Sequence, residues 1–113
     1  MKILFRPRVL YGSGITTATL WEGLTIQNGY LKGDFGSGVY ISGTITVKNC
    51  LIRNNALTST ALRQGGAGVY LGSSSCQLVD CVVRNNLLRP SSQGAGAGVY
   101  MDGGTIINTM ISK

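Results

Sequence analysis

Four carboxylates, Glu22, Asp34, Asp80 and Asp102, are the side chains of this 113-residue chain best suited to acid–base chemistry. The chain contains no histidine, which removes imidazole as a general base, as an activator of a nucleophile and as a metal ligand. Glycoside hydrolysis needs a pair of acids flanking one bond, and calcium needs six or more oxygen ligands. No pair among the four carboxylates is evidently placed for either task. We therefore expect no catalytic residues, no metal and no cofactor.

Two recurring sets of side chains could instead hold a ligand. Tyr40, Tyr70 and Tyr100 lie 30 residues apart, and Arg53 and Arg84 lie 31 residues apart. Aromatic rings offer flat platforms to sugar rings, and cations beside them suit an acidic polymer. The alternative is that the rings only stack on one another and that the arginines form a solvated edge. The candidate ligand-binding face consists of the outward-pointing Tyr40, Tyr70, Tyr100, Arg53 and Arg84, and the protruding loops after the third strands add Lys32, Arg63 and Arg89 on the same edge.

These residues belong to an internal repeat of about 30 residues. The block Gly-x-Gly-Val-Tyr occurs at 36–40, 66–70 and 96–100, and the block Asn/Asp-Cys-x-x-Arg-Asn-Asn occurs at 49–55 and 80–86. Residues 23–29 and the tail from Asn108 fit the second block in weakened form. A fixed period of this size indicates a repeat architecture in which each unit packs on its neighbours.

Within each unit the apolar residues alternate with a period of two, which indicates strands. Turn-forming residues such as Ser42-Gly43 and Asn54-Asn55 separate three short strands per unit. We therefore predict an all-β protein, a parallel β-helix of about three and a half coils. It forms one domain over residues 9–113 after an irregular segment at residues 1–8.

Equivalent residues of successive coils should form columns inside the solenoid. Four columns are expected: Val39, Val69 and Val99; Ile41, Leu71 and Met101; Cys50 and Cys81; Ile52, Val83 and Ile111. The three cysteines should be free thiols, because their number is odd and no short spacing recurs. A ladder of side-chain amides is expected at one corner, formed by Asn28, Asn54, Asn55, Asn85 and Asn86.

The combination of Gly-x-Gly-Val-Tyr with Asn-Cys-x-Ile-x-Asn-Asn resembles the repeats of right-handed parallel β-helices of the pectin-lyase-like superfamily. It is closest to bacterial surface proteins that resemble polymorphic outer membrane proteins. The resemblance covers residues 9 to 113 and implies a right-handed coil and a secreted or cell-surface location. The superfamily includes lyases, hydrolases, adhesins and passive stalks, so the resemblance specifies the fold better than the function.

The formal charge of +6 allows a polyanionic partner but equally serves solubility. The apolar run near the N-terminus is too short for a signal peptide, and no apolar run is long enough for a membrane span. The chain opens inside a coil and closes after a strand. We therefore expect a fragment of a longer solenoid, or end-to-end self-association through open terminal coils.

The sequence thus favours a non-catalytic structural or interaction segment of a bacterial surface or secreted β-helix protein, with polysaccharide as the candidate ligand. The alternative is part of a carbohydrate-active enzyme, a polysaccharide lyase or glycoside hydrolase of the pectin-lyase-like type. A nucleic-acid partner would rest on charge alone and is the least favoured.

Overall fold

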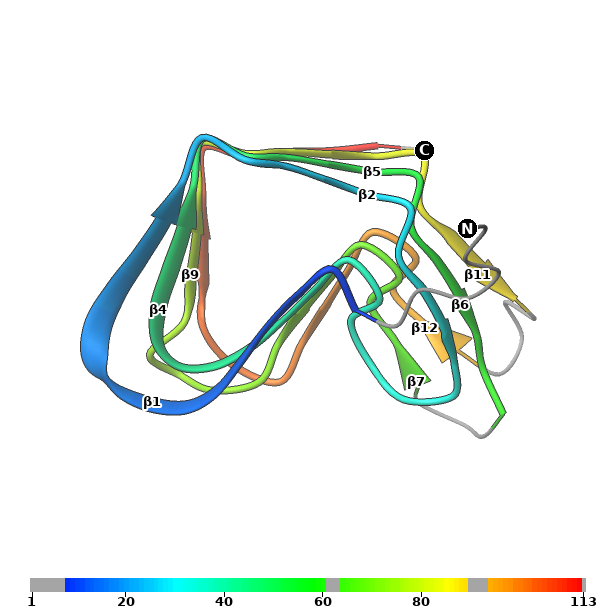
Figure 1. Cartoon of the computed structure of the whole chain (residues 1–113), viewed down its shortest axis with the longest axis horizontal. Coiled ribbons are helices and arrows are strands. Elements are labelled where there is room, and N and C mark those ends of the chain that lie inside the picture. The colour runs from blue at the N-terminus through cyan, green and yellow to red at the C-terminus, as the bar shows by residue number, and fades with distance from the viewer. Residues whose placement is uncertain (1–7, 61–63, 90–93, 113) are drawn as a thin grey trace, which may run out of the picture.

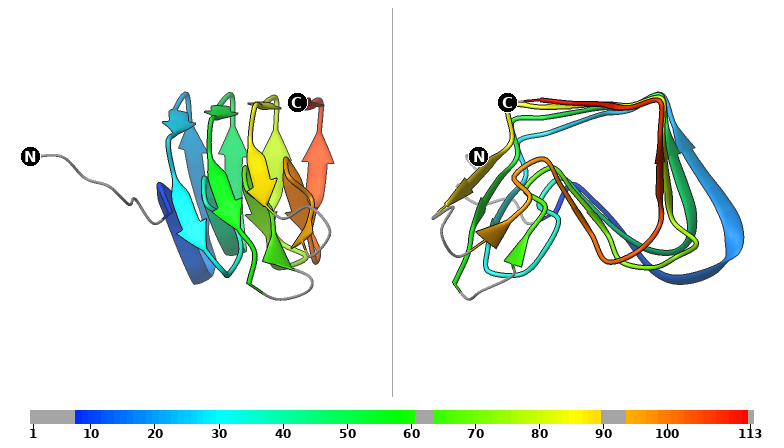
Figure 2. Two further views of the ribbon diagram at one scale, coloured as in Figure 1. Left: turned by 90° about the vertical axis from the view of Figure 1, so that its right-hand side faces the viewer. Right: turned by 180° about the vertical axis from the view of Figure 1, so that it is seen from behind.

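The computed structural model describes residues 8–60, 64–89 and 94–112, and within them it contains strands and turns but no helix. The chain winds through about three turns of a parallel β-solenoid, which confirms the predicted fold class. Figure 1 looks along the solenoid, and Figure 2 shows its coils lying side by side. Every strand pair is parallel.

Four parallel sheets form the walls of the solenoid, and we call them sheets A to D. Sheet A contains β1 (Leu10–Glu22), β4 (Val39–Lys48), β8 (Val69–Leu71), β9 (Gln77–Val79), β13 (Val99–Met101) and β14 (Thr105–Ile107). Sheet B contains β2 (Thr25–Gln27), β5 (Leu51–Arg53), β10 (Val82–Arg84) and β15 (Met110–Ile111). Sheet C contains β3 (Tyr30–Lys32), β6 (Ala56–Thr58) and β11 (Leu87–Arg89), and sheet D pairs β7 (Gln64–Gly65) with β12 (Gly94–Ala95).

Sheet A is bent, because the long strands β1 and β4 run through two limbs. In the first limb the beginning of β4 pairs with β8, which pairs with β13, and in the second limb the end of β4 pairs with β9, which pairs with β14. β1 is longer than β4 and pairs with it through two register shifts, so the first coil bulges outward in Figure 1. The outer face of the second limb therefore differs from coil to coil.

The predicted columns are present. Val39 pairs with Val69 and Val69 with Val99, while Ile52 pairs with Val83 and Val83 with Ile111. The members in the middle coils are fully buried, whereas Met101 and Ile111 of the last coil are exposed. Cys50, Cys76 and Cys81 are buried free thiols, as expected. Stacking equivalent aliphatic side chains thus gives one continuous main core.

Three strands per coil were expected, and the structure has more. The segments predicted as loops after the third strand contain β3, β6 and β11, which form sheet C. Leu57 and Leu88 are buried in a small second core beside Ala67, and the partly buried Leu31 packs against this core. One apolar residue in three gives no alternation to recognise, so the sequence pattern does not reveal these strands.

The corner between sheets B and C divides the asparagines into two kinds. Asn28, Asn54 and Asn85 adopt positive φ angles of 65°, 56° and 55° and lie exposed at the bend. The amide ladder runs one residue further on, where Asn55 Nδ2 donates to Asn86 Oδ1 at 3.0 Å. Gly29 occupies the equivalent place in the first coil, and its N–H donates to Asn55 Oδ1 at 2.8 Å. The expected five-residue ladder is therefore an Asn55–Asn86 ladder beside a row of left-handed bends.

The described residues include no helix long and apolar enough to cross a membrane. At the last coil several apolar side chains are exposed, among them Met101, Ile107, Met110 and Ile111. Self-association through the terminal coils stays a prediction.

Candidate functional site

The tyrosines form one continuous column on the first limb of sheet A. Tyr11, Tyr40, Tyr70 and Tyr100 pair in register on adjacent strands. Their ring centroids are separated by 5.0, 4.8 and 5.8 Å in order along the column. Rings at these distances gain stability from one another. Because each inner ring is covered by its neighbours, the column does not present a row of free flat faces to a ligand.

Phe35 packs against the column from outside. Its ring centroid lies 4.8 Å from that of Tyr70 and 5.4 Å from that of Tyr100. Tyr70 is consequently 8% exposed, whereas Tyr40 and Tyr100 are half-buried. The central ring of the outward tyrosine ladder is therefore covered by Phe35 and not exposed. Sequence reasoning missed Phe35 because it precedes the first repeat block and has no equivalent in the later ones.

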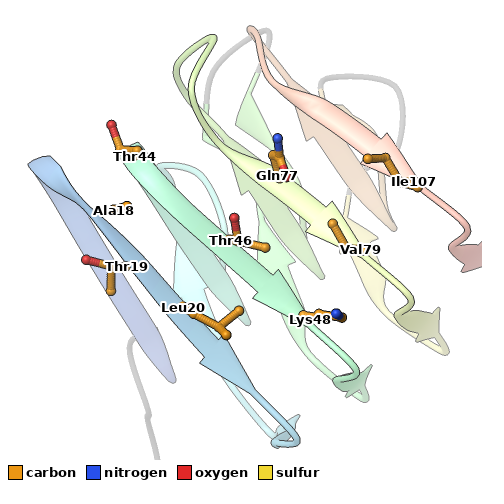
Figure 3. Close-up of a pocket in the computed structure, with 9 residues that line it drawn as sticks. All are labelled: Ala18, Thr19, Leu20, Thr44, Thr46, Lys48, Gln77, Val79 and Ile107. Atoms are coloured by element: carbon orange, nitrogen blue, oxygen red, sulfur yellow. The ribbon is translucent and has the colours of Figure 1, made fainter.

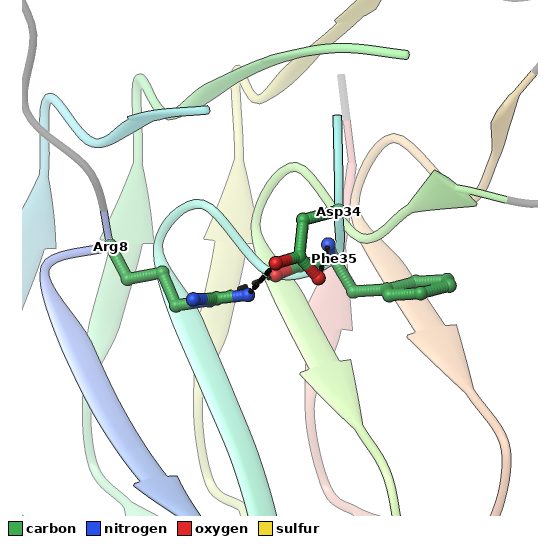
Figure 4. A network of polar contacts seen from close by, with 3 residues as sticks. All are labelled: Arg8, Asp34 and Phe35. Atoms are coloured by element: carbon green, nitrogen blue, oxygen red, sulfur yellow. Dashed lines mark hydrogen bonds and ion pairs between the residues drawn. The ribbon is translucent and has the colours of Figure 1, made fainter. Parts of the chain in front are cut away.

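Arg8 holds the other end of the column in place (Figure 4). Its guanidinium forms an ion pair with Asp34 at 2.7 Å, and its Nε donates to the carbonyl oxygen of Phe35 at 3.1 Å. The guanidinium carbon also lies 5.0 Å from the ring centroid of Tyr11 and 4.6 Å from that of Tyr40. These contacts link the segment before β1 to the aromatic column through cation–π attraction and an ion pair.

Tyr70 has a further partner in the next coil, since its hydroxyl donates to Asp102 Oδ2 at 2.7 Å. Burial raises the pKa of Tyr70 well above its ordinary value, and the hydrogen bond and the negative charge of Asp102 raise it further. The neutral phenol is therefore stabilised in the folded state, and Tyr70 keeps its proton at neutral pH.

This raised pKa predicts an alkaline loss of stability that Tyr70→Phe should remove. The unfolded chain releases the Tyr70 proton near pH ~10 while the folded chain keeps it, so the free energy of unfolding falls as pH rises above that value. Urea titrations should show that the free energy of unfolding of the wild type exceeds that of the variant by about 1 kcal/mol near neutral pH. This difference should shrink above pH ~10. A difference that stays constant across the alkaline range would contradict the assignment.

The arginines do not lie beside the tyrosines. Arg53 and Arg84 pair on adjacent strands of sheet B. They point outward, because the preceding residues Ile52 and Val83 point inward and are buried. The tyrosines point outward from sheet A, on another side of the main core (Figure 1). The predicted face of tyrosine and arginine is therefore split between two sides of the solenoid. Alternation shows whether a residue points in or out, but it does not show toward which side of the molecule.

The remaining predicted cations fall on sheet C or outside the described residues. Lys32 and Arg89 are the last residues of β3 and β11, and both pair in register with Thr58. They are strand residues on an outer sheet face and not residues of protruding loops. Arg63 lies outside the described residues.

Each of the four carboxylates already has a partner. Asp34 pairs with Arg8, and Asp102 accepts from Tyr70. At the corner between sheets A and B, Asn49 Nδ2 donates to Glu22 Oε2 at 3.2 Å and Asn108 Nδ2 donates to Asp80 Oδ1 at 2.7 Å. Within the described residues no three His, Cys, Asp or Glu side chains gather as a metal site would require. The acids are thus distributed over separate structural contacts.

The cysteines are equally unsuited to nucleophilic chemistry. All three are buried, and burial raises the pKa of the Cys81 thiol. A reactive cysteine needs an accessible thiolate with a lowered pKa. The thiols of Cys50 and Cys81 instead donate to the carbonyl oxygens of Lys48 and Val79 at 3.3 and 3.2 Å.

A shallow groove crosses the outer face of the second limb of sheet A (Figure 3). It has a volume of about 440 Å³ and receives side chains from β1, β4, β9 and β14. The short Thr46 side chain of β4 lies between Leu20 of the preceding coil and Gln77 of the following one. Its lining residues are Ala18, Thr19, Leu20, Thr44, Thr46, Lys48, Gln77, Val79 and Ile107.

The groove combines hydrogen-bonding groups with apolar contact surface. Thr46 and Gln77 offer a hydroxyl and an amide, and Lys48 adds one cation. Leu20 is 55% exposed and Ile107 is 45% exposed, so aliphatic surface is available at two sides of the groove. Sequence reasoning missed this site because Thr44, Thr46 and Lys48 do not recur in the other units. The outward positions around Ile45 and Val47 were the available signal.

Comparison with protein-family models, curated proteins and solved structures gives no match to this chain.

Proposed function

We propose that this chain is a non-catalytic structural and interaction segment of a β-solenoid protein, and that it binds polysaccharide along the groove on sheet A. The groove is the observation that carries the proposal. It is open, it crosses four strands, and its lining mixes hydroxyl, amide and aliphatic groups. An extended polymer can lie along such a surface, with hydrogen bonds to its hydroxyl groups and aliphatic contacts to its ring faces.

The distribution of acids supports a non-catalytic role. A hydrolase would need two carboxylates facing one bond, with one of them free to give a proton. In this chain Glu22 and Asp80 accept hydrogen bonds from asparagines at a corner, and Asp34 and Asp102 hold other contacts. The groove itself is lined by no carboxylate. Binding without turnover is therefore the activity that these residues favour.

The family and location remain part of the proposal. The resemblance of the repeats favours the right-handed parallel β-helices of the pectin-lyase-like superfamily, and with them a bacterial surface or secreted protein. The stacked tyrosines, the Asn55–Asn86 ladder and the repeated glycines would then serve to keep the coils in register. The groove, which does not repeat, would carry the specificity.

Removal of polar groups from the groove tests the proposal. A Thr46→Val, Gln77→Met double variant keeps the shape of the strands and removes a hydroxyl and an amide. We expect neutral-polysaccharide binding, measured on a glycan panel with the immobilised chain, to weaken by about tenfold. Thr25→Val removes an exposed hydroxyl from the outer face of sheet B and is the matched control.

Equal binding by the double variant and by the wild type would place the ligand elsewhere or remove it altogether. Incubation of the same polymers with the chain supplies the test against the enzyme. Release of unsaturated or shortened sugars would replace the binding proposal with a carbohydrate-active enzyme.

A further inference from the structure

A basic surface surrounds the corner at which sheet B passes into sheet C, and Figure 1 shows the course of the backbone through this corner. Arg53 and Arg84 are the last residues of β5 and β10, just before the bend. Lys32 and Arg89 are the last residues of β3 and β11, just after it. Arg84, Lys32 and Arg89 are exposed and Arg53 is half-buried. We call this surface the basic corner.

An apolar strip lies between the two sets of cations. Tyr30, Ala56 and Leu87 pair in register on sheet C and point outward, because Leu57 and Leu88 beside them are buried. Leu87 is 45% exposed. A shallow depression of about 260 Å³ is lined by Tyr30, Ala56, Leu57, Thr58, Leu87 and Arg89. The basic corner thus offers a cationic rim around an apolar floor.

No carboxylate neutralises the basic corner. The strands of sheets B and C and the bends between them contain no Asp or Glu, and all four acids of the chain are engaged at other places. Arg53 and Arg84 are also directly paired on adjacent strands, an arrangement of like charges that costs stability. An anionic ligand lying across the two strands would remove that cost.

We propose that the basic corner binds an acidic polysaccharide, with Arg53, Arg84 and Arg89 contacting its carboxylates and with Tyr30 and Leu87 contacting a sugar ring. Successive coils lie ~4.8 Å apart. Cations stacked on them can therefore face successive carboxylates of a polymer that carries one carboxylate per sugar. Planar guanidinium groups match carboxylates in a bidentate way. The ligand follows the axis of the solenoid, across the ends of β5 and β10.

The described part of the basic corner favours a sugar polymer over a nucleic acid. Single-stranded nucleic acids are bound by several aromatic rings, each stacking on one base. Tyr30 is the one aromatic residue in sheets B and C, and its hydroxyl lies 3.2 Å from that of Thr58. One tethered ring can support one sugar but does not form a series of stacking platforms.

This inference rests on the proposed role of the chain in binding polysaccharide, but it concerns a separate surface and a charged ligand. The test is the affinity of the whole chain for polygalacturonate, with neutral galactan and oligodeoxythymidylate as comparison polymers. An Arg84→Gln, Arg89→Gln variant should bind polygalacturonate about tenfold more weakly. A Lys2→Gln, Arg6→Gln variant loses the same formal charge outside the described residues and should bind as the wild type does. An Arg84→Lys, Arg89→Lys variant should recover much of the affinity.

Three results would overturn the inference: no affinity for polygalacturonate, equal losses in the two glutamine variants, or tighter binding of oligodeoxythymidylate than of polygalacturonate. Equal losses would show that net charge acts and not the basic corner. The groove on sheet A is tested independently by Thr46→Val, Gln77→Met with neutral polymers. If one of the two binding surfaces is refuted, the experiment on the other can still be interpreted. Unchanged circular dichroism of the variants would show that the exposed substitutions leave the solenoid intact.

Discussion

Replacement of Gly68 by alanine is expected to lower the free energy of unfolding by about 3 kcal/mol, although it adds a single methyl group. A Cβ at this position would lie 2.5 Å from the carbonyl oxygen of Gly98 and 2.9 Å from Nδ2 of Asn86. The Gly98 carbonyl cannot move away freely, because it accepts a 2.9 Å hydrogen bond from the N–H of Val69. The Asn86 amide is held in turn by its bonds in the ladder. The cost therefore reaches both neighbouring coils.

Gly23→Ala is the control for this substitution. Gly23 has a positive φ of 74° but has no atom within 4 Å of an added Cβ, so alanine there meets strain without a clash. We expect a loss of about 1 kcal/mol at Gly23. Urea or thermal denaturation of both variants gives the comparison. A loss at Gly68 no larger than the loss at Gly23 would show that the neighbouring atoms move to admit a methyl group, and that lack of space beside the amide ladder does not explain the second glycine of the Gly-x-Gly block.

The repeat predicted the interior well because equivalent residues in a solenoid share one environment. Val39, Val69 and Val99 are in register, and Cys50 and Cys81 directly precede the paired residues Leu51 and Val82. The first glycine of the block lies where the chain turns into the strand, and Gly66 has a positive φ of 70°. The second glycine is needed because a side chain there would clash with Asn86, which is distant in the sequence. No local pattern shows that requirement.

The amide ladder illustrates the same limit. Both asparagines of each pair were assigned to it, since asparagine is suited to a left-handed bend and to an amide ladder alike. The structure separates the roles: Asn54 makes the bend, and Asn55 points inward to the ladder. Which of two adjacent asparagines points inward depends on how sheet B turns into sheet C. The sequence did not predict that turn, because it did not predict β6, a strand that buries a single leucine.

The outer surface was predicted least well, because it depends on residues that differ among the repeats. Phe35 covers Tyr70 from a segment without equivalents, and the groove exists because Thr46 is shorter than its column neighbours Leu20 and Gln77. Self-similarity finds the residues that keep coils together. Residues that recognise a ligand on one side of a solenoid need not recur. Arg53 and Arg84 do recur, and they pair in register on adjacent strands of sheet B.

Asn55→Ala is expected to destabilise the protein by about 3 kcal/mol, because it leaves several buried polar groups without partners. The Asn55 side chain is fully buried. Its Oδ1 accepts from the N–H of Gly29 at 2.8 Å, and its Nδ2 donates to the carbonyl oxygen of Ile26 at 3.3 Å and to Asn86 Oδ1 at 3.0 Å. These bonds join three successive coils through one side chain. Alanine would remove them and leave a polar cavity too enclosed for ordinary solvation.

Asn54→Ala separates this effect from the bend. Asn54 is exposed with a φ of 56°, so its replacement should cost about 1 kcal/mol, through the left-handed conformation alone. Asn55→Asp adds a sharper test, since a carboxylate can still accept from Gly29 but cannot donate to Asn86, and burial penalises its charge. Its stability should fall below that of the wild type at neutral pH and recover in part as pH falls and the carboxyl group is protonated, because the neutral acid can donate again. Equal thermal midpoints for Asn54→Ala and Asn55→Ala would contradict the assignment of the ladder to Asn55. A midpoint for Asn55→Asp that does not change with pH would show that the buried amide contributes by its shape and not by its hydrogen bonds.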